Sequence, residues 1–329
     1  MSTIGNSVLT LADWSKRRDP SGKTATIIEA IEEYKPALED AITIEGNLPT
    51  GNRTTIRTSE PSGTWRQINA GVQVVKTGTK QVTDAAGMLE AYSEVDKALA
   101  DLSADTAAFR WSEDKGILSG LGTETERAIF YGDSTEVPEE PMGLAPRYNT
   151  LGDYCISAGG SGADNRSIFL VTWSVNTCHL FFPKGSNAGI EVTDKGQVTL
   201  NASGDFGSTA RQFEGYRTHF KNYMGLSLRD ERSVVRICNI DNSAMVAGTD
   251  PGFASLLIRA VNAVRGQPGK QVFYMPQSVK TWIDIASQAV ANANMALTMK
   301  QWGGRSVPAF WDIPLRVSDC LEVNEATIS

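Results

Sequence analysis

The sequence predicts an α+β protein with mixed strands, and three observations lead to this fold class. Several stretches repeat apolar residues at the three-to-four-residue spacing of a helix. Other short stretches are rich in β-branched and aromatic residues, as strands are. The chain has 329 residues and shows neither an internal repeat nor a low-complexity tract. This length is enough for a substantial core and suggests roughly two domains.

The composition describes a globular protein and limits its partners. Hydrophobic residues make up 41% and charged residues 21%, and the net charge of -7 disfavours tight general binding to nucleic acid. No secretory signal or apolar run of membrane-spanning length is seen, so we expect a soluble protein made inside the cell. The four cysteines lack C-x-x-C spacing and are expected to be free thiols: Cys155, Cys178, Cys238 and Cys320.

The N-terminal part is predicted to be an arm. Residues Leu9–Arg18 form a short amphipathic stretch, and Lys23–Tyr34 carries apolar residues at helical spacing before Pro36. Two such short helices bury little area alone, so the arm should lie on the rest of the chain or on a neighbouring subunit.

Glycine and proline punctuate the next stretch, Gly46–Val75. Within it, Thr54–Thr58 and Thr64–Ile68 predict two strands of a hairpin joined by the loop Ser59–Gly63. The stretch has few large apolar residues to bury, so the hairpin should project.

Two helices are predicted next. Apolar residues three or four apart predict a helix over Asp84–Leu102, and a longer one is expected over Ser103–Tyr131, ending at Gly132. The remaining strands are expected at Ser167–Trp173, His179–Phe182, Ile190–Val192, Gln212–Leu228 with Ser233–Ile240 as a long pair, Gln271–Met275, Phe310–Val317 and Leu321–Val323. Further helices should start at Asp250, as N-cap before Pro251, and at Ser278.

Motifs for catalysis or for cofactor and metal binding are weak. Gly22-Lys23-Thr24 resembles the end of a phosphate-binding loop, but the loop's first glycine and its preceding strand are missing. Only two histidines are present, His179 and His219, and neither has metal-ligand spacing. The glycine-rich Gly159–Gly162 lacks a dinucleotide-binding context. We therefore predict no catalytic site, cofactor or metal; an enzyme with a spatially assembled site is the remaining alternative of that class.

A charge asymmetry suggests a contact between copies of the chain. Residues 46–76 carry four basic side chains against Glu60, whereas residues 84–105 carry six acidic side chains against Lys97. Two independent solvated faces would explain this pattern; a hairpin lying on the acidic segment of another copy would explain it as well. The candidate contact residues are Arg53, Arg57, Glu60, Trp65 and Arg66 in the hairpin, with Glu90, Glu94, Asp96 and Asp101 as acceptors.

Long segments resemble the major capsid proteins of short-tailed bacteriophages, the group around epsilon-fifteen and the Bordetella tropism-switching phage. They include LTLADWSKRRDPSGKTATIIE, EGNLPTGNRTTIRTSEPSGTWRQIN, MLEAYSEVDKALADLSADTAAFRWSED, FYGD followed by PMGLAPRY, and GYRTHFKNYMGLSLRDERSVVRICNID. They span Leu9–Asp241 in a fixed order, and FWDIPLRVSD looks like the closing strand of these proteins.

The resemblance implies the Hong Kong 97-like capsid fold, with an N-terminal arm, an E-loop hairpin, a peripheral (P) domain with a long spine helix, and an axial (A) domain. The implied boundaries are 1–45 for the arm, 46–82 for the E-loop, 83–137 for the P domain with the spine helix, 138–207 for the first part of the A domain, 208–240 for P-domain strands, and 241–329 for the rest of the A domain and the closing strands.

The same resemblance implies a structural protein and not an enzyme. Hexamers and pentamers would close an icosahedral shell around double-stranded DNA, which the wall would contact weakly and non-specifically, without any membrane. The implied partners are other copies, a portal protein, a separate scaffolding protein and a decoration or cement protein. The shell would assemble in the host bacterial cytoplasm and become the virion capsid. Some members of the fold cross-link through an E-loop lysine, but no lysine lies between Gly46 and Val75. An encapsulin, a bacterial compartment of the same fold, is the alternative.

Overall fold

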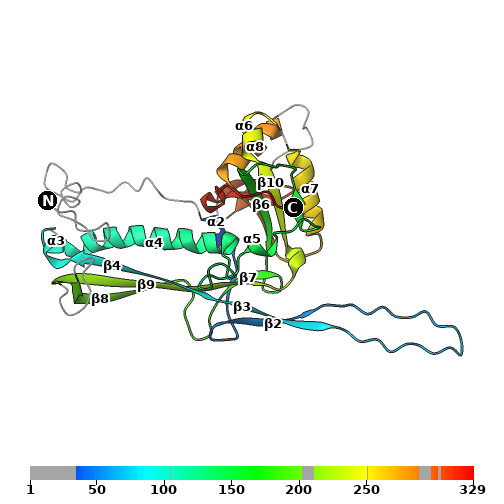
Figure 1. The fold of residues 1–329 in the computed structure, drawn as a ribbon, viewed down its shortest axis with the longest axis horizontal. Coiled ribbons are helices and arrows are strands. Elements are labelled where there is room, and N and C mark those ends of the chain that lie inside the picture. Colours follow the sequence, from blue (N-terminus) through cyan, green and yellow to red (C-terminus); the bar gives the residue numbers. More distant parts are fainter. Residues whose placement is uncertain (1–34, 104, 202–210, 250, 289–297, 303–304) are drawn as a thin grey trace. The chain divides into compact units, whose positions relative to one another are not determined.

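The computed structural model describes residues 35–103, 105–201, 211–249, 251–288, 298–302 and 305–329, which form two compact units (Figure 1). Within the described residues, the first unit combines Met88–Thr125 with Gly189–Tyr223. The second unit combines Tyr34–Gly87, Glu126–Ala188 and Met224–Ser329. The helices predicted over Leu9–Arg18 and Lys23–Tyr34 lie outside the described residues.

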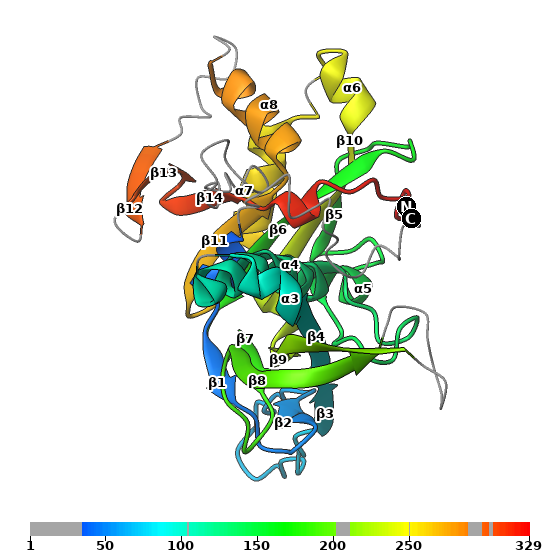
Figure 2. The ribbon, with the colours of Figure 1, turned by 90° about the vertical axis from the view of Figure 1, so that its left-hand side faces the viewer.

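In the first unit a helix lies over one face of a three-stranded sheet. Strand β9 (Gln212–Leu228) pairs with β8 (Ile190–Asn201) and with β4 (Gly87–Asp96). Figure 2 shows α4 (Thr106–Tyr131) and α3 (Lys97–Asp101) on the same side of this sheet. Thr218 and Asn222 of β9 hydrogen-bond to Asp114 and Thr125 of α4. A small apolar cluster of Val95, Leu99, Ala100 and Phe109, with Tyr216 against it, joins the two layers.

The predicted long helix is confirmed as α4. Asp105 begins it by accepting the backbone N–H groups of Ala107 and Ala108, as an N-cap residue does. A side chain added at Gly116 or Gly120 would meet open space. These glycines therefore lower the helix propensity of α4, but close packing does not require them. Gly132 follows the last helical residue as expected.

The helix predicted over Asp84–Leu102 is wrong. These residues form the end of β3, the whole of β4 and the short helix α3. Met88 and Tyr92 are four residues apart, which fits one helical turn but equally puts both on one face of a strand. Both are exposed, with Glu90 between them, so the pattern followed the two-residue period of a strand.

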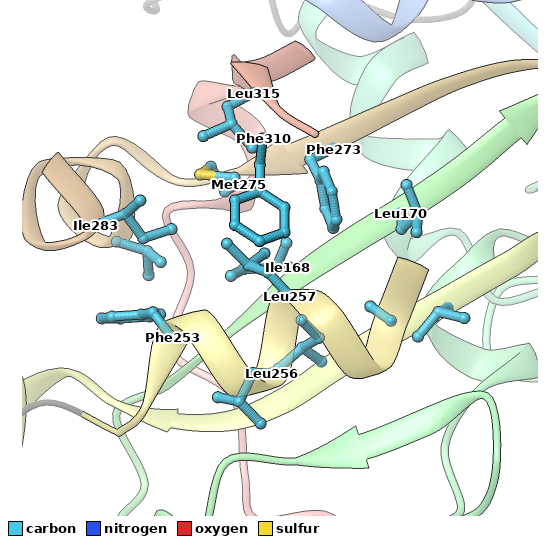
Figure 3. Close-up of a cluster of buried hydrophobic side chains, with 14 of the residues drawn as sticks. Ile168, Leu170, Phe253, Leu256, Leu257, Phe273, Met275, Ile283, Phe310 and Leu315 are labelled. Atoms are coloured by element: carbon cyan, nitrogen blue, oxygen red, sulfur yellow. The ribbon is translucent and has the colours of Figure 1, made fainter. Parts of the chain in front are cut away.

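The second unit is built around strand β6 (Asn165–Trp173), all of whose side chains are buried. It pairs antiparallel with β10 (Val234–Asp241) and β11 (Lys270–Met275), which pair in parallel with β5 (Cys155–Ser157) and β14 (Ile313–Val317) respectively. Helices α7 (Phe253–Ala263) and α8 (Gln277–Gln288) pack their apolar faces against this sheet. Figure 3 shows Phe253, Leu257 and Ile283 of these helices near Ile168 and Phe273 of the strands.

Shorter elements complete the second unit. The chain enters through α2 (Pro36–Asp40) and β1 (Thr43–Glu45), and β1 pairs in parallel with β7 (Cys178–Phe182). The other elements are α5 (Leu144–Arg147), η1 (Glu231–Ser233), α6 (Asn242–Val246), β12 (Thr298–Trp302), β13 (Arg305–Phe310) and η3 (Asp319–Leu321). Trp311 and Asp312, both with positive φ, make the tight turn from β13 to β14.

The hairpin is longer than predicted. Its first strand is confirmed as β2 (Gly51–Arg57), but the partner is β3 (Thr79–Ala85), with Arg57 opposite Thr79. The predicted return strand Thr64–Ile68 is wrong, since residues 58–78 have no regular structure apart from a turn at Ile68–Asn69. Proline cannot donate a backbone hydrogen bond to a neighbouring strand, and glycine weakens a strand. This stretch contains both residue types.

Three further predictions are corrected. The long strands β9 and β10 do not pair with each other: β9 pairs with β8, β4 and β7, and β10 with β5 and β6. Helix α7 begins at Phe253 with Gly252 as its N-cap, instead of Asp250. Leu321–Val323 is not a strand, because Leu321 ends the short helix η3. The other predicted strands are confirmed, although β8 extends from Ile190 as far as Asn201 and the turn at Trp311–Asp312 divides Phe310–Val317 between β13 and β14.

Candidate assembly surfaces

The base of the hairpin is held in the second unit by contacts between buried side chains. Asn52 donates to the Ser227 hydroxyl at 3.2 Å, and both side chains are buried. Asp84, opposite Asn52 in the register, is buried and forms an ion pair with Arg147 at 2.8 Å. Burying a charge requires such a partner. The two strands therefore leave the second unit from a fixed base (Figure 1).

The hairpin tip, residues 58–78, exposes large apolar side chains. Trp65, Ile68 and Val74 have relative exposures of 102%, 91% and 100%, and Val72 and Val75 are more than half exposed. Soluble monomers rarely display such a group of apolar residues unless another surface covers it. The sequence prediction singled out Trp65 but missed the other four. The signal for three of them was the run Val72-Gln73-Val74-Val75, directly after Gly71.

The predicted hairpin residues all lie on this projecting element and are exposed: Arg53, Arg57, Glu60, Trp65 and Arg66. Arg53 is tied to the hairpin itself, because its guanidinium donates to Thr83 at 3.2 Å and its backbone N–H to Asn47 at 2.8 Å. Arg57 stands at the end of β2, and Arg66 lies in the tip. These two cations are therefore best placed to reach another molecule.

The predicted acidic acceptors lie on β4 and α3 of the first unit, and each has a partner there. Glu90 contacts His219 at 3.0 Å and Tyr223 at 3.1 Å, and the His219 hydrogen bond is the main factor that lowers the pKa of Glu90. Glu94 forms an ion pair with Arg217 at 2.6 Å. Asp96 caps α3 by accepting the Ala98 N–H, and Asp101 pairs with Lys97 at 2.8 Å.

These contacts make the outer face of the β8–β9–β4 sheet a mixed polar and aromatic surface. Tyr92 stacks on His219 with ring centroids 4.4 Å apart, and the Arg217 guanidinium lies 5.3 Å from the Tyr92 ring centroid. The sequence prediction missed Arg217, His219 and Lys221, which come from β9 and partly neutralise β4. Their alternation with inward residues of β9 was the available signal.

The second unit contains a buried ionic cluster that the sequence did not reveal. Arg236 forms an ion pair with Glu325 at 2.9 Å and donates to the backbone carbonyls of Ala145 and Tyr148, each at 3.0 Å. Glu325 also accepts from Tyr131 at 2.6 Å and from Ser167. The ion pair joins residues 89 positions apart, and all its charged atoms have partners, so this cluster fixes the C-terminal segment against β10 and α4.

A second buried carboxyl lies near the C-terminal end of α4. One oxygen of Glu126 accepts the Ala37 N–H at 3.2 Å and the Ser318 hydroxyl at 2.8 Å. Burial raises the pKa of Glu126 to about 7. This residue thus links α4, α2 and the end of the closing strand.

The structure places the weak sequence motifs as follows. His179 lies buried in β7, where desolvation lowers its pKa to about 4, and His219 stands in β9. Among the residues that the structure describes, no group of three His, Cys, Asp or Glu side chains is arranged to hold a metal ion. None of the described helices is long and apolar enough to cross a membrane. The Gly22-Lys23-Thr24 stretch lies outside the described residues.

Comparisons with known proteins agree on one family. The family model of Major capsid protein GP7 matches residues 19–329. The capsid structure of bacteriophage epsilon15 matches with a TM-score of 0.77 and 32% identity, covering 100% of both chains. No curated protein sequence matches the chain at a significant level.

Two weaker structural matches add no argument. The capsid of bacteriophage JBD30 matches with a TM-score of 0.49 and 9% identity, covering 95% of this chain and 99% of that one. The holo-SrpI encapsulin complex from Synechococcus elongatus matches with a TM-score of 0.43 and 9% identity, covering 71% and 97%. The family match over residues 19–329 and the epsilon15 match favour the phage capsid over the encapsulin alternative.

Proposed function

This chain belongs to the Major capsid protein GP7 family and is the major capsid protein of a tailed bacteriophage with a Hong Kong 97-like fold; from that premise we propose how its copies join. The protein forms the shell of the virion. In our proposal the copies group as hexamers and pentamers, and the shell encloses double-stranded DNA. Assembly takes place in the cytoplasm of the host bacterium.

The hairpin tip carries this proposal. It projects from a fixed base and exposes Trp65, Ile68 and Val74 almost completely. In a capsid the available cover is another copy of the chain, so the hairpin of one copy should lie across a neighbour. An interface of this kind is heterologous, and such contacts close into rings when the rotation allows. Large aromatic residues are also the usual anchors of binding energy, which puts Trp65 first.

The charged contacts refine the orientation of the hairpin. Arg57 and Arg66 are exposed cations, and Glu90 and Asp101 are the more exposed of the proposed acceptors. The acceptors already have intramolecular partners, so a neighbour's arginine would share them. Such a shared rim contact sets register and encounter rate more than affinity.

Further partners follow from the capsid role. We expect a portal protein, a separate scaffolding protein and a decoration or cement protein to bind the shell. The net charge of -7 supports only weak, non-specific contact with the packaged DNA. No lysine lies between Gly46 and Val75, but the observed hairpin extends to Ala85 and includes Lys76 and Lys80, so the missing lysine does not decide whether the hairpin contact is covalent.

A charge reversal in the hairpin tests the proposal. The double variant Arg57→Glu, Arg66→Glu should stay folded, because both side chains are exposed, but should fail to form closed shells. Circular dichroism would check folding, and negative-stain electron microscopy would check assembly. Arg57→Lys, Arg66→Lys, which keeps both charges, is the matched control and should assemble. Normal shells from the reversed variant would refute the contact.

A further inference from the structure

Two cysteine thiols from different strands meet inside the second unit. Strand β5 pairs in parallel with β10, and the register puts Cys155 opposite Arg236 and Ser157 opposite Cys238. The two sulfur atoms are 3.7 Å apart, which is van der Waals contact without a bond. Both residues are buried, with exposures of 3% and 0%. The two thiols are 83 residues apart in sequence, so only the fold brings them together.

The surroundings of the two thiols differ in a way that favours reaction at Cys155. Its thiol donates to the carbonyl oxygen of Tyr148 at 3.4 Å, and the Arg236 guanidinium donates to that same oxygen at 3.0 Å, so the oxygen keeps a donor when the thiol loses its proton. The hydrogen bond from Cys238 and the nearby positive charge of Arg236 lower the pKa of Cys155. A thiolate, and not a thiol, is the nucleophile in sulfur chemistry.

Cys155 also lines a cleft and belongs to a short strand. The other walls of the cleft include Asp153, Tyr154 and Arg229. Strand β5 has three residues and, among the described strands, pairs with β10 alone, so it is an edge strand. A disulfide needs the sulfur atoms at about 2.0 Å, so closing one here requires this short strand to shift against β10.

We propose that Cys155 and Cys238 are a redox pair that closes to an intramolecular disulfide when the protein meets a peroxide. The Cys155 thiolate attacks one peroxide oxygen and breaks the O–O bond, which leaves a sulfenic acid and, after protonation, one water or alcohol molecule. The sulfur of Cys238 then attacks the sulfenic sulfur; the S–S bond forms and a second water leaves. The two thiols lose two electrons and two protons, and the peroxide is reduced. The expectation that this oxidation takes place outside the reducing host rests on the proposed function as a virion shell. The formation of a disulfide between Cys155 and Cys238 does not depend on that function.

The other two cysteines provide internal controls. Cys178 is fully buried in β7, and Cys320 in η3 contacts the Ser318 hydroxyl. None of the four cysteines forms a disulfide in this structure. An oxidation that follows this geometry therefore joins Cys155 to Cys238 and leaves the remaining two available for alkylation.

The test is peptide mapping of the full-length protein, purified in reductant and then treated with hydrogen peroxide. After denaturation and alkylation without reductant, we expect one linked pair of peptides, containing Cys155 and Cys238, with the mass reduced by two hydrogens. Reduction should abolish it, and Cys155→Ser or Cys238→Ser should prevent it, whereas Cys178→Ser should not. Alkylation of all four cysteines after peroxide treatment, or a link to Cys178 or Cys320, would overturn the proposal. The wild-type map decides the question even if a serine variant fails to fold, and it does so whether or not the protein forms shells.

Discussion

The buried cluster beneath α7 and the hairpin tip carry similar apolar side chains in opposite environments. Phe253, Leu257 and Phe273 are at most 1% exposed, whereas Trp65 and Ile68 of the tip are 102% and 91% exposed. Burying one such side chain is worth about 1.5–3 kcal/mol. In the cluster this free energy stabilises the fold of a single chain; in the tip it is available only when a second chain arrives.

The comparison predicts that changes in the two regions separate folding from assembly. A change in the cluster should lower the stability of the unassembled chain. A change in the tip should leave that stability alone and reduce shell formation. The four tests that follow run from the largest expected effect on stability to the smallest.

Truncation in the cluster should have the largest effect. Phe273→Ala removes a fully buried ring of β11 from this cluster and should cost about 3–5 kcal/mol of unfolding free energy. Phe273→Leu, which keeps most of the volume, should cost clearly less. Urea unfolding of the unassembled full chain measures both. Equal, small losses would mean that the cluster does not carry the stability assigned to it.

The buried Glu126 carboxyl should make stability depend on pH. Its pKa is about 7 in the fold against 4.5 for an exposed glutamate, so the neutral form is favoured by the fold. Its contribution is present below pH 4.5, is lost as the pH rises through 7, and amounts to about 3 kcal/mol at most. Lys35 and Asp319 are the charged groups that face it.

The variant Glu126→Gln isolates this contribution, because the amide oxygen can still accept from Ala37 and Ser318. Subtracting the unfolding free energy of the variant from that of the wild type at each pH should give a difference that falls between pH 4.5 and 7. A difference that stays constant over this range would show that Glu126 titrates normally.

The exposed ion pair between Arg217 and Glu94 should contribute little. Its atoms are 2.6 Å apart, but both side chains are partly exposed, so we expect a coupling below about 1 kcal/mol that weakens with salt. A double-mutant cycle with Arg217→Ala and Glu94→Ala measures it. A coupling of several kcal/mol would mean that this polar face is as important to folding as the apolar cluster.

Truncation of the tip should have the smallest effect on stability and a large one on assembly. Trp65→Ala should change the unfolding free energy of the unassembled chain by less than about 0.5 kcal/mol, since the ring makes no buried contact. Light scattering under assembly conditions should nevertheless show greatly reduced shell formation. Val137→Ala, at an exposed apolar residue outside the tip, serves as the control. Normal assembly by Trp65→Ala would remove the distinction between the two regions.

Sequence reasoning worked where one period dominates a long stretch. Helix α4 and strands β6 and β9 were predicted within three residues of their observed bounds. It failed at Asp84–Leu102, where the spacing of Met88 and Tyr92 suits both a helix and a strand. It also failed at the return strand of the hairpin. The strand that pairs with β2 is β3, and Arg57 lies opposite Thr79, which is 22 residues further along the chain.

For the candidate surfaces, sequence located the hairpin and its charges but not what they face. Each predicted acceptor has a partner, and for Glu90 and Glu94 these partners lie on β9, more than 120 residues away. The Arg236–Glu325 pair and the contact between Cys155 and Cys238 depend on strand register as well. Distances of this kind are set by the assembled sheet and leave no local pattern in the sequence.

The open tip of the hairpin has a consequence for the time course of shell growth. Residues 58–78 lack regular structure, and fixing each backbone residue on a neighbour costs about 1–2 kcal/mol of conformational entropy. The net binding free energy of one docked tip is therefore small, and a complex of two copies should dissociate quickly. Growth should begin only after a lag, once several tips engage within one small nucleus, and a finished shell should persist after dilution to concentrations at which none would form.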